Sequence, residues 1–159
     1  MSVGKRFENE LRKSFMEQFP NAFVYRIPDS NQTWGGHKTP ADMIVCTGEM
    51  DLLIECKAFK GPSLPMANVK LHQVEALEAF DAMHESCHGW LLCFPHRGKR
   101  KVKGTEAYII PIDKWVEFFR RNSRKSYPLQ EMEKCQSITW SKGRWDLSSI
   151  RNTHQHQKK

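Results

Sequence analysis

The sequence lacks any hydrophobic run that could cross a membrane. Its longest apolar runs, such as residues 52–54 and 90–94, span only a few positions, whereas a membrane helix needs about 20 apolar residues. The N-terminus turns polar within its first residues, which argues against a signal peptide. The five cysteines are odd in number and contain no CxxC pair, so neither a disulfide framework nor a standard zinc motif is indicated. We therefore expect a cytoplasmic protein with free thiols and no membrane segment.

Acidic residues are scarce in the last quarter of the chain, which holds all of the excess positive charge. The 159 residues include 25 Lys and Arg against 18 Asp and Glu, a net charge of +7. Residues 1–119 contain equal numbers of basic and acidic residues, whereas residues 120–159 contain ten basic and three acidic ones. A second basic block occupies residues 97–103. Both segments indicate a polyanionic partner, most simply a nucleic acid; the alternative is solvated surface with a disordered tail.

The length and the 39% of hydrophobic residues suit one domain with its own core. Asn68 and Asp113 are plausible helix N-caps. Residues 1–122 are expected to form the domain, and residues 123–159 a basic, partly disordered C-terminal extension in which residues 140–145 are compatible with a hairpin. The order αβββαββα indicates an α/β fold with a central mixed sheet flanked by helices. Apolar periodicity and turn residues predict helices over residues 2–19, 68–85 and 113–122 and strands over residues 22–27, 42–47, 51–57, 88–94 and 106–111.

Three charged residues on two neighbouring strands point to chemistry. Glu55 and Lys57 share one face of the third-strand segment, because side chains at i and i+2 of a strand point the same way. A tight turn at Gly48 would place Asp42, at the start of the preceding strand, beside Glu55. Two adjacent carboxylates repel each other unless a cation lies between them, and such hard oxygen ligands suit Mg²⁺ or Mn²⁺. The alternative is a pair of surface salt bridges on an edge strand, against which the apolar run 52–54 argues.

These residues resemble a known nuclease motif. Asp42, Glu55 and Lys57 look like the PD-(D/E)XK signature, with Pro40 separated from the Asp by one extra Ala. Gly4 followed four residues later by Glu8 resembles the first helix of RecU- and Hjc-type Holliday junction resolvases. Residues 63–73 are similar to the RecU segment that follows the Glu-x-Lys strand. The resemblance covers roughly residues 4–120 and implies a restriction-endonuclease-like core.

The resemblance also implies roles for individual residues. Asp42, Glu55 and the backbone carbonyl of Cys56 would bind the divalent metal, and Lys57 would hold or activate the attacking water. Glu8 would be a further carboxylate of the site. Its position four residues after the glycine, bordering the apolar stripe of the first helix, distinguishes it from Glu10, which is expected to face solvent. Alternatively, Glu8 is a helix-surface residue paired with Arg12, and Lys57 forms a plain salt bridge to Glu55.

Further residues were assigned by their position along the chain. Gln73 lies on the inner stripe of its helix and needs a hydrogen-bond partner, for which the attacking water or a DNA phosphate would serve; a bond to backbone is the alternative. Trp34 and Phe59 could stack on exposed bases, although packing on the core is the more ordinary role. Phosphate contacts are expected from the basic residues Arg26, Lys38, Lys60, Lys70, Arg97, Lys99, Arg100, Lys101 and Lys103.

Taken together, the motif and the resemblance predict a metal-dependent, structure-specific endonuclease that resolves four-way DNA junctions. Two symmetric cuts would require a homodimer with one site in each subunit. The resemblance implies the cytoplasm of a bacterial or phage-infected cell. Two alternatives stay open. One is another PD-(D/E)XK nuclease of restriction or repair type, and the other is a DNA-binding module without catalysis.

Overall fold

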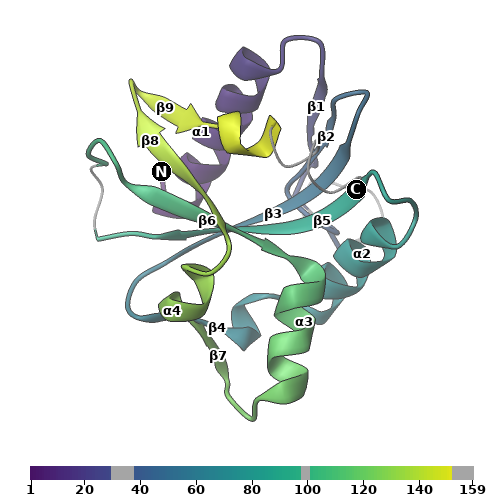
Figure 1. Cartoon of the computed structure of the whole chain (residues 1–159), viewed down its shortest axis with the longest axis vertical. Coiled ribbons are helices and arrows are strands. Elements are labelled where there is room, and N and C mark those ends of the chain that lie inside the picture. The colour runs from purple at the N-terminus through teal and green to yellow at the C-terminus, as the bar shows by residue number, and fades with distance from the viewer. Residues whose placement is uncertain (30–37, 98–100, 152–159) are drawn as a thin grey trace.

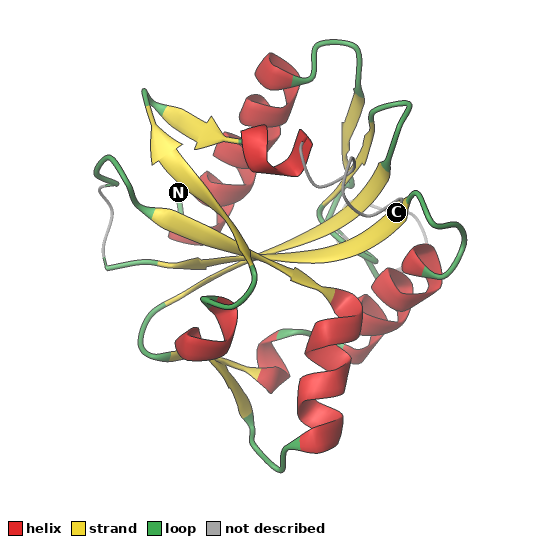
Figure 2. Ribbon diagram, viewed as in Figure 1, coloured by secondary structure: helices red, strands yellow, loops and turns green. Residues whose placement is uncertain are grey.

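A computed structural model describes residues 1–29, 38–97 and 101–151. Its centre is a seven-stranded sheet in the order β1-β2-β3-β5-β6-β8-β9. Helices flank the sheet on both faces (Figures 1 and 2). Only the β3–β5 pair is parallel, and α2 lies in the connection between these two strands. The elements are α1 (Val3–Gln18), β1 (Phe23–Arg26), β2 (Met43–Cys46), β3 (Asp51–Phe59), β4 (Ser63–Pro65), the 3₁₀ helix η2 (Met66–Asn68), α2 (Leu71–Asp81), β5 (Cys87–Pro95), β6 (Glu106–Pro111), α3 (Ile112–Arg121), β7 (Ser126–Pro128), α4 (Leu129–Met132), β8 (Gln136–Ser141) and β9 (Arg144–Asp146).

Two hydrophobic layers hold the helices against the sheet. Helix α1 covers one face, where Phe7 packs on Phe94 and Trp145. Helices α2 and α3 cover the other face, where Leu77 and Trp115 are buried. Figure 1 shows α1 on one side of the sheet and α2 and α3 on the other. The predicted mixed sheet flanked by helices is confirmed. The physical reason for this arrangement is that the central strands carry apolar side chains on both faces, so both faces must be covered.

The predicted strands agree with the structure to within about two residues, whereas the second helix differs more. Val69 has an extended backbone, with φ −102° and ψ 109°. This separates η2 from α2, so that α2 begins at Leu71 with Lys70 as N-cap and ends at Asp81. Asn68 is therefore not the cap. Asp113 lies in the first turn of α3, whose N-cap position is Pro111.

The boundary expected after residue 122 does not separate two parts of the structure. Strand β8 pairs antiparallel with β6, and β9 pairs with β8 around a turn in which Lys142 and Gly143 both have positive φ. Trp145 is fully buried against α1. The extension thus completes the sheet and covers the first helix. Residues 152–159, at the end of the extension that was expected to be partly disordered, lie outside the described residues. Within the described residues no helix is long and apolar enough to span a membrane.

A glycine sets how closely α2 approaches the sheet. A Cβ atom on Gly89 of β5 would lie 2.3 Å from the backbone oxygen of Leu77 in α2. The backbone N–H of Gly89 also donates to Oδ1 of Asp81 at the end of α2. Any side chain at this position would push the helix outward. Because α2 carries Gln73, this contact also sets the position of one side of the site described next.

Candidate active site

Asp42 lies just before β2, at the point where the β2–β3 ladder ends. Its backbone N–H donates to the carbonyl of Ile54 at 2.9 Å, which continues the ladder by one step. Its Oδ2 accepts the N–H of Cys56 at 2.7 Å, so a side chain replaces the next backbone partner. This contact fixes the Asp42 carboxylate beside the middle of β3, where Glu55 lies.

Glu55 is the most deeply buried charged residue among the described parts of the chain, at 3% exposure. Its Oε2 accepts a hydrogen bond from Nε2 of Gln73 at 2.9 Å and lies 3.5 Å from Nζ of Lys57. Burial raises the pKa of this carboxyl well above its ordinary value, the negative charge of Asp42 raises it further, and Lys57 opposes both. Two acidic groups crowded together in a poorly hydrated place form a site that favours a cation.

Gln73 faces the site as predicted, but its partner differs from the one expected. The amide nitrogen bonds to Glu55, and its Oε1 accepts the backbone N–H of Lys70 at 3.0 Å. The side chain therefore joins the first turn of α2 to β3. Its role in the described structure is to orient Glu55.

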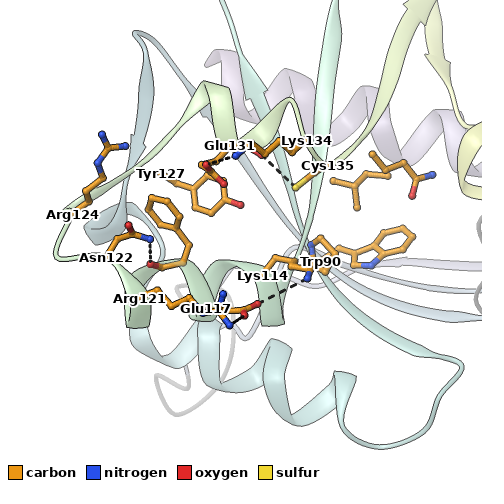
Figure 3. A pocket seen from close by; sticks show the side chains of 14 residues that line it. Trp90, Lys114, Glu117, Arg121, Asn122, Arg124, Tyr127, Glu131, Lys134 and Cys135 are labelled. Atoms are coloured by element: carbon orange, nitrogen blue, oxygen red, sulfur yellow. Dashed lines mark hydrogen bonds and ion pairs between the residues drawn. The ribbon is translucent and has the colours of Figure 1, made fainter.

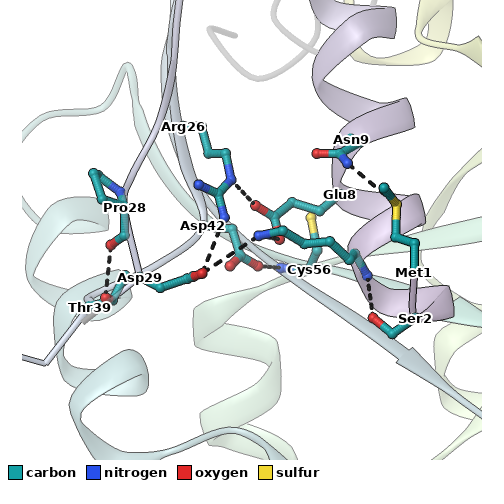
Figure 4. Close-up of polar contacts among 11 residues, drawn as sticks. Met1, Ser2, Glu8, Asn9, Arg26, Pro28, Asp29, Thr39, Asp42 and Cys56 are labelled. Carbon is teal, nitrogen blue, oxygen red and sulfur yellow. Dashed lines mark hydrogen bonds and ion pairs between the residues drawn. The ribbon is translucent and has the colours of Figure 1, made fainter. Parts of the chain in front are cut away.

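Glu8 enters the site from α1, on the other side of the sheet, and is 8% exposed. Its carboxylate lies 3.0 Å from Nε of Arg26 and 3.7 Å from Nζ of Lys5 (Figure 4). Both cations also reach Asp29, at 3.4 and 3.8 Å. Burial raises the pKa of Glu8, and the charge of Asp42 adds to this effect. Glu8 is thus close enough to Asp42 to sense its charge, and its ion-pair partners are Arg26 and Lys5.

Sequence reasoning missed Lys5 and Asp29 and proposed Arg12 as the alternative partner of Glu8. Lys5 could have been found, because residues three apart on a helix are neighbours. Asp29 follows β1 and has no motif around it. Its place became visible only with the fold.

The three predicted carboxylates do not form one compact cluster. Within residues 1–29, 38–97 and 101–151, no three His, Cys, Asp or Glu side chains come together closely enough to hold a metal ion. The ion pairs of Glu8 explain this, because they hold its carboxylate on Arg26 and Lys5.

Asp42 and Glu55 nevertheless suit a magnesium ion. Mg²⁺ often takes only one or two protein carboxylates, with water and substrate phosphate completing the shell. The N–H of Cys56 points toward Asp42, and within a strand the carbonyl of the same residue points to the same side. The carbonyl of Cys56 therefore faces the side of β3 on which the Asp42 carboxylate lies.

A cleft of about 690 Å³ opens over this arrangement. Asp42, Glu55 and Gln73 lie in it, with the exposed Lys38 and Lys70 among its other lining residues. His72 also lines it. Positive groups around an acidic centre suit a polyanionic backbone whose phosphate meets the carboxylates through a cation.

A second cavity of about 680 Å³ lies between α3, β7, α4 and β8 (Figure 3). It holds several cations, but Arg121 is paired with Glu117 at 2.8 Å and Lys134 with Glu131 at 2.8 Å. None of the predicted site residues lines this cavity. The two cavities have nearly the same volume, but Asp42, Glu55 and Gln73 line the first cavity and not the second.

Lys101 differs from its predicted role as a DNA contact. Its ammonium lies 2.7 Å from Oε1 of Glu10 and only 8% of the side chain is exposed. The rings of Trp140, Phe94 and Trp145 surround it, with centroids 4.8, 5.4 and 6.0 Å away. Glu10 is therefore not the solvent-facing residue expected from its helix position. This ion pair joins Lys101, which lies between β5 and β6, to α1, so the Lys101 ammonium already has a partner.

The other predicted contacts divide into four groups. Arg26 is engaged with Glu8 and Asp29. Phe59 is buried in the core, in line with its more ordinary role. Lys38, Lys60, Lys70, Arg97 and Lys103 are exposed. Lys99, Arg100 and Trp34 lie outside the described residues.

Comparison with known proteins shows the fold. The chain matches no protein-family model and no curated protein sequence. Among solved structures it is similar to Hjc, a Holliday junction resolvase from the archaeal hyperthermophile Archaeoglobus fulgidus, with a TM-score of 0.54 and 17% sequence identity. The similarity covers 94% of this chain and 98% of that chain. The predicted restriction-endonuclease-like fold is confirmed.

Proposed function

We propose that this protein is a metal-dependent DNA endonuclease that resolves four-way junctions by phosphodiester hydrolysis. The observation that carries the proposal is the meeting of Asp42 and Glu55 with Lys57 and Gln73 at the end of the β2–β3 ladder. This arrangement lies in a fold similar to that of a Holliday junction resolvase.

Asp42, Glu55 and the carbonyl of Cys56 would hold Mg²⁺ or Mn²⁺. When bound, such an ion polarises the scissile phosphate and lowers the pKa of water. The raised pKa of Glu55 in the metal-free chain supports this assignment, because a cation would relieve the repulsion by Asp42 that contributes to it.

Lys57 would act on the reacting groups. Its ammonium shares the sheet face and the carboxylate oxygen of Glu55, so it can orient a water at that oxygen and stabilise negative charge that develops on the phosphate. The salt bridge to Glu55, which the sequence left as an alternative, is present and is compatible with this role. Gln73 would keep the Glu55 carboxylate in place through its amide.

Glu8 would act mainly by holding Arg26 and Lys5 beside the two ligands. Both cations are positioned by Glu8 and Asp29 together, and Asp29 is also one of the residues that line the cleft. Direct ligation of the metal by Glu8 requires its ion pairs to break first.

A four-way junction has two strands to be cut, so a symmetric pair of cuts calls for two active sites related by a two-fold axis. We therefore propose a homodimer. Such an enzyme reads shape mainly through phosphate contacts, and the exposed lysines around the cleft are suited to that.

The deciding experiment compares cleavage of a four-way junction with cleavage of a linear duplex of equal length, with and without Mg²⁺. We expect symmetric nicks in the junction only, loss of cleavage in Asp42→Asn with junction binding retained, and normal cleavage in Glu85→Gln, a matched change of an exposed carboxylate. Light scattering should give twice the chain mass. Equal cutting of duplex by a monomer would mean a different nuclease of the same motif, and binding without cleavage in Mg²⁺ or Mn²⁺ would mean a non-catalytic module.

A further inference from the structure

Two large aromatic rings are exposed side by side on the edge strand β1. Phe23 is 61% and Tyr25 46% exposed. Their ring centroids are 6.0 Å apart and their planes differ by only 11°, so the two rings lie nearly parallel in a stacked arrangement. Rings of this size are usually buried, and their exposure on a strand of the central sheet calls for a partner.

The rings lie on the same face of the sheet as the candidate metal ligands. Tyr25 is paired with Ile44 of β2, and Ile44 shares its face with Asp42 two residues earlier. Val24, between the two rings, packs instead into the layer beneath α1. From strand spacing, the Cα atoms of Tyr25 and Asp42 are roughly 8 Å apart. The two rings thus lie on the sheet face of the cleft, one strand further toward the edge of the sheet.

We propose that Phe23 and Tyr25 form a stacking platform for a nucleobase that is unpaired or splayed at the branch point, next to the phosphate to be cut. The proposal rests on the proposed function in taking branched DNA as the substrate. Exposed aromatic side chains stack on bases of any sequence, because every base has a π-face. A continuous duplex offers no free base face at this point, so the platform would favour branched DNA.

The surroundings favour a nucleic acid over a second protein surface. The rings lie on the same sheet face as Asp42, which lines a cleft that also holds the exposed Lys38 and Lys70, and cations in the same region as aromatic rings match the alternation of phosphate and base in a strand of DNA. Strand β1 is only four residues long and ends at Arg26, and a short edge with a charged end is a poor template for pairing with another sheet.

The test uses the full chain in a metal-chelating buffer, so that binding is measured without hydrolysis. The probes are a four-way junction carrying 2-aminopurine at the branch point and a fully paired duplex of equal length. The test variant is Phe23→Ser with Tyr25→Ser. The control is Met16→Ala, which removes an exposed apolar side chain of α1.

We expect the wild type to quench 2-aminopurine fluorescence and the double variant to lose the quenching. The double variant should bind the junction about tenfold more weakly or worse, since 1.4 kcal/mol corresponds to a factor of ten, and duplex binding should not change. Tyr25→Phe should behave as the wild type does, because the ring is kept.

Equal weakening on junction and duplex, or unchanged quenching in the double variant, would overturn the proposal. The proposal would also be overturned if the double variant shifted from dimer to monomer in light scattering while the other junction contacts stayed intact. In that case the rings would join two copies of the chain. If the wild type quenches the probe but cuts no DNA with any metal, the platform stands and the nuclease proposal fails.

Discussion

Glu55→Gln offers a direct test of the metal site through stability. Burial and the charge of Asp42 raise the pKa of Glu55 in the folded, metal-free chain, whereas the unfolded chain has the ordinary value of 4.5. The folded state therefore binds a proton that the unfolded state has already lost at neutral pH. By linkage, stability is fully present below the unfolded pKa and decreases as the pH rises toward the folded pKa.

The pKa of Glu55 rises from 4.5 to about 9 in the folded chain, and this displacement sets the upper limit of the stability gain. Each unit of displacement corresponds to about 1.4 kcal/mol, and the residue is almost fully buried, so solvent screens little of it. The glutamine keeps the shape and the acceptor for Gln73 but carries no charge. In chelator at alkaline pH the variant should be more stable than the wild type by about 2 kcal/mol, or roughly 4–8 °C in Tm.

Thermal unfolding across the pH range, in chelator and in Mg²⁺, measures both effects. The wild type should lose stability as the pH rises in chelator and regain it in Mg²⁺, by about 2.7 kcal/mol at a hundredfold excess over Kd. Glu55→Gln should show neither response, and Glu85→Gln should behave as the wild type does. A wild type whose stability is flat with pH, or a Glu55→Gln variant that Mg²⁺ stabilises as strongly as the wild type, would refute the reasoning.

Four further substitutions test other parts of the structure. Gly89→Ala should lower stability by about 2 kcal/mol because its Cβ would collide with the backbone of Leu77, which denaturant unfolding would detect as a lower midpoint. Lys101→Met should cost about 2 kcal/mol of stability by removing the ammonium from its aromatic cage, and it should leave the salt dependence of DNA binding unchanged. Lys103→Ala, a change at an exposed lysine, should instead reduce the slope of log K against log salt concentration by about 0.9. The opposite pattern would mean that Lys101 contacts DNA. Lys57→Ala should reduce single-turnover cleavage by about two to three powers of ten while Mg²⁺ still stabilises the protein, and wild-type rates would remove Lys57 from the chemistry.

Local pattern in the sequence predicted most of the sheet and identified Asp42 and Glu55 as the central pair of carboxylates. Residues that alternate or recur every fourth position must bury one face, so the strand around Glu55 and the helix that carries Glu8 could be predicted without any tertiary information. The hairpin that brings Asp42 beside Glu55 needs only a short turn, and this placement agrees with the structure. The hairpin at residues 140–145 was also readable from its turn, and it is present.

Contacts between distant parts of the chain were decided only by the tertiary structure. Lys101 and Glu10 are separated by 91 positions, and no periodicity relates them, so a lysine in a basic block looked like a phosphate contact until the fold enclosed it among aromatic rings. Glu8 pairs with Arg26 because β1 passes beside α1, which no local pattern states. Strand β8 joins the sheet because β6 would otherwise leave an unpaired edge. Pairing across the sheet is a property of the folded chain as a whole, and this is why the sequence could place Asp42 beside Glu55 but could not assign Arg26 and Lys5 as the partners of Glu8.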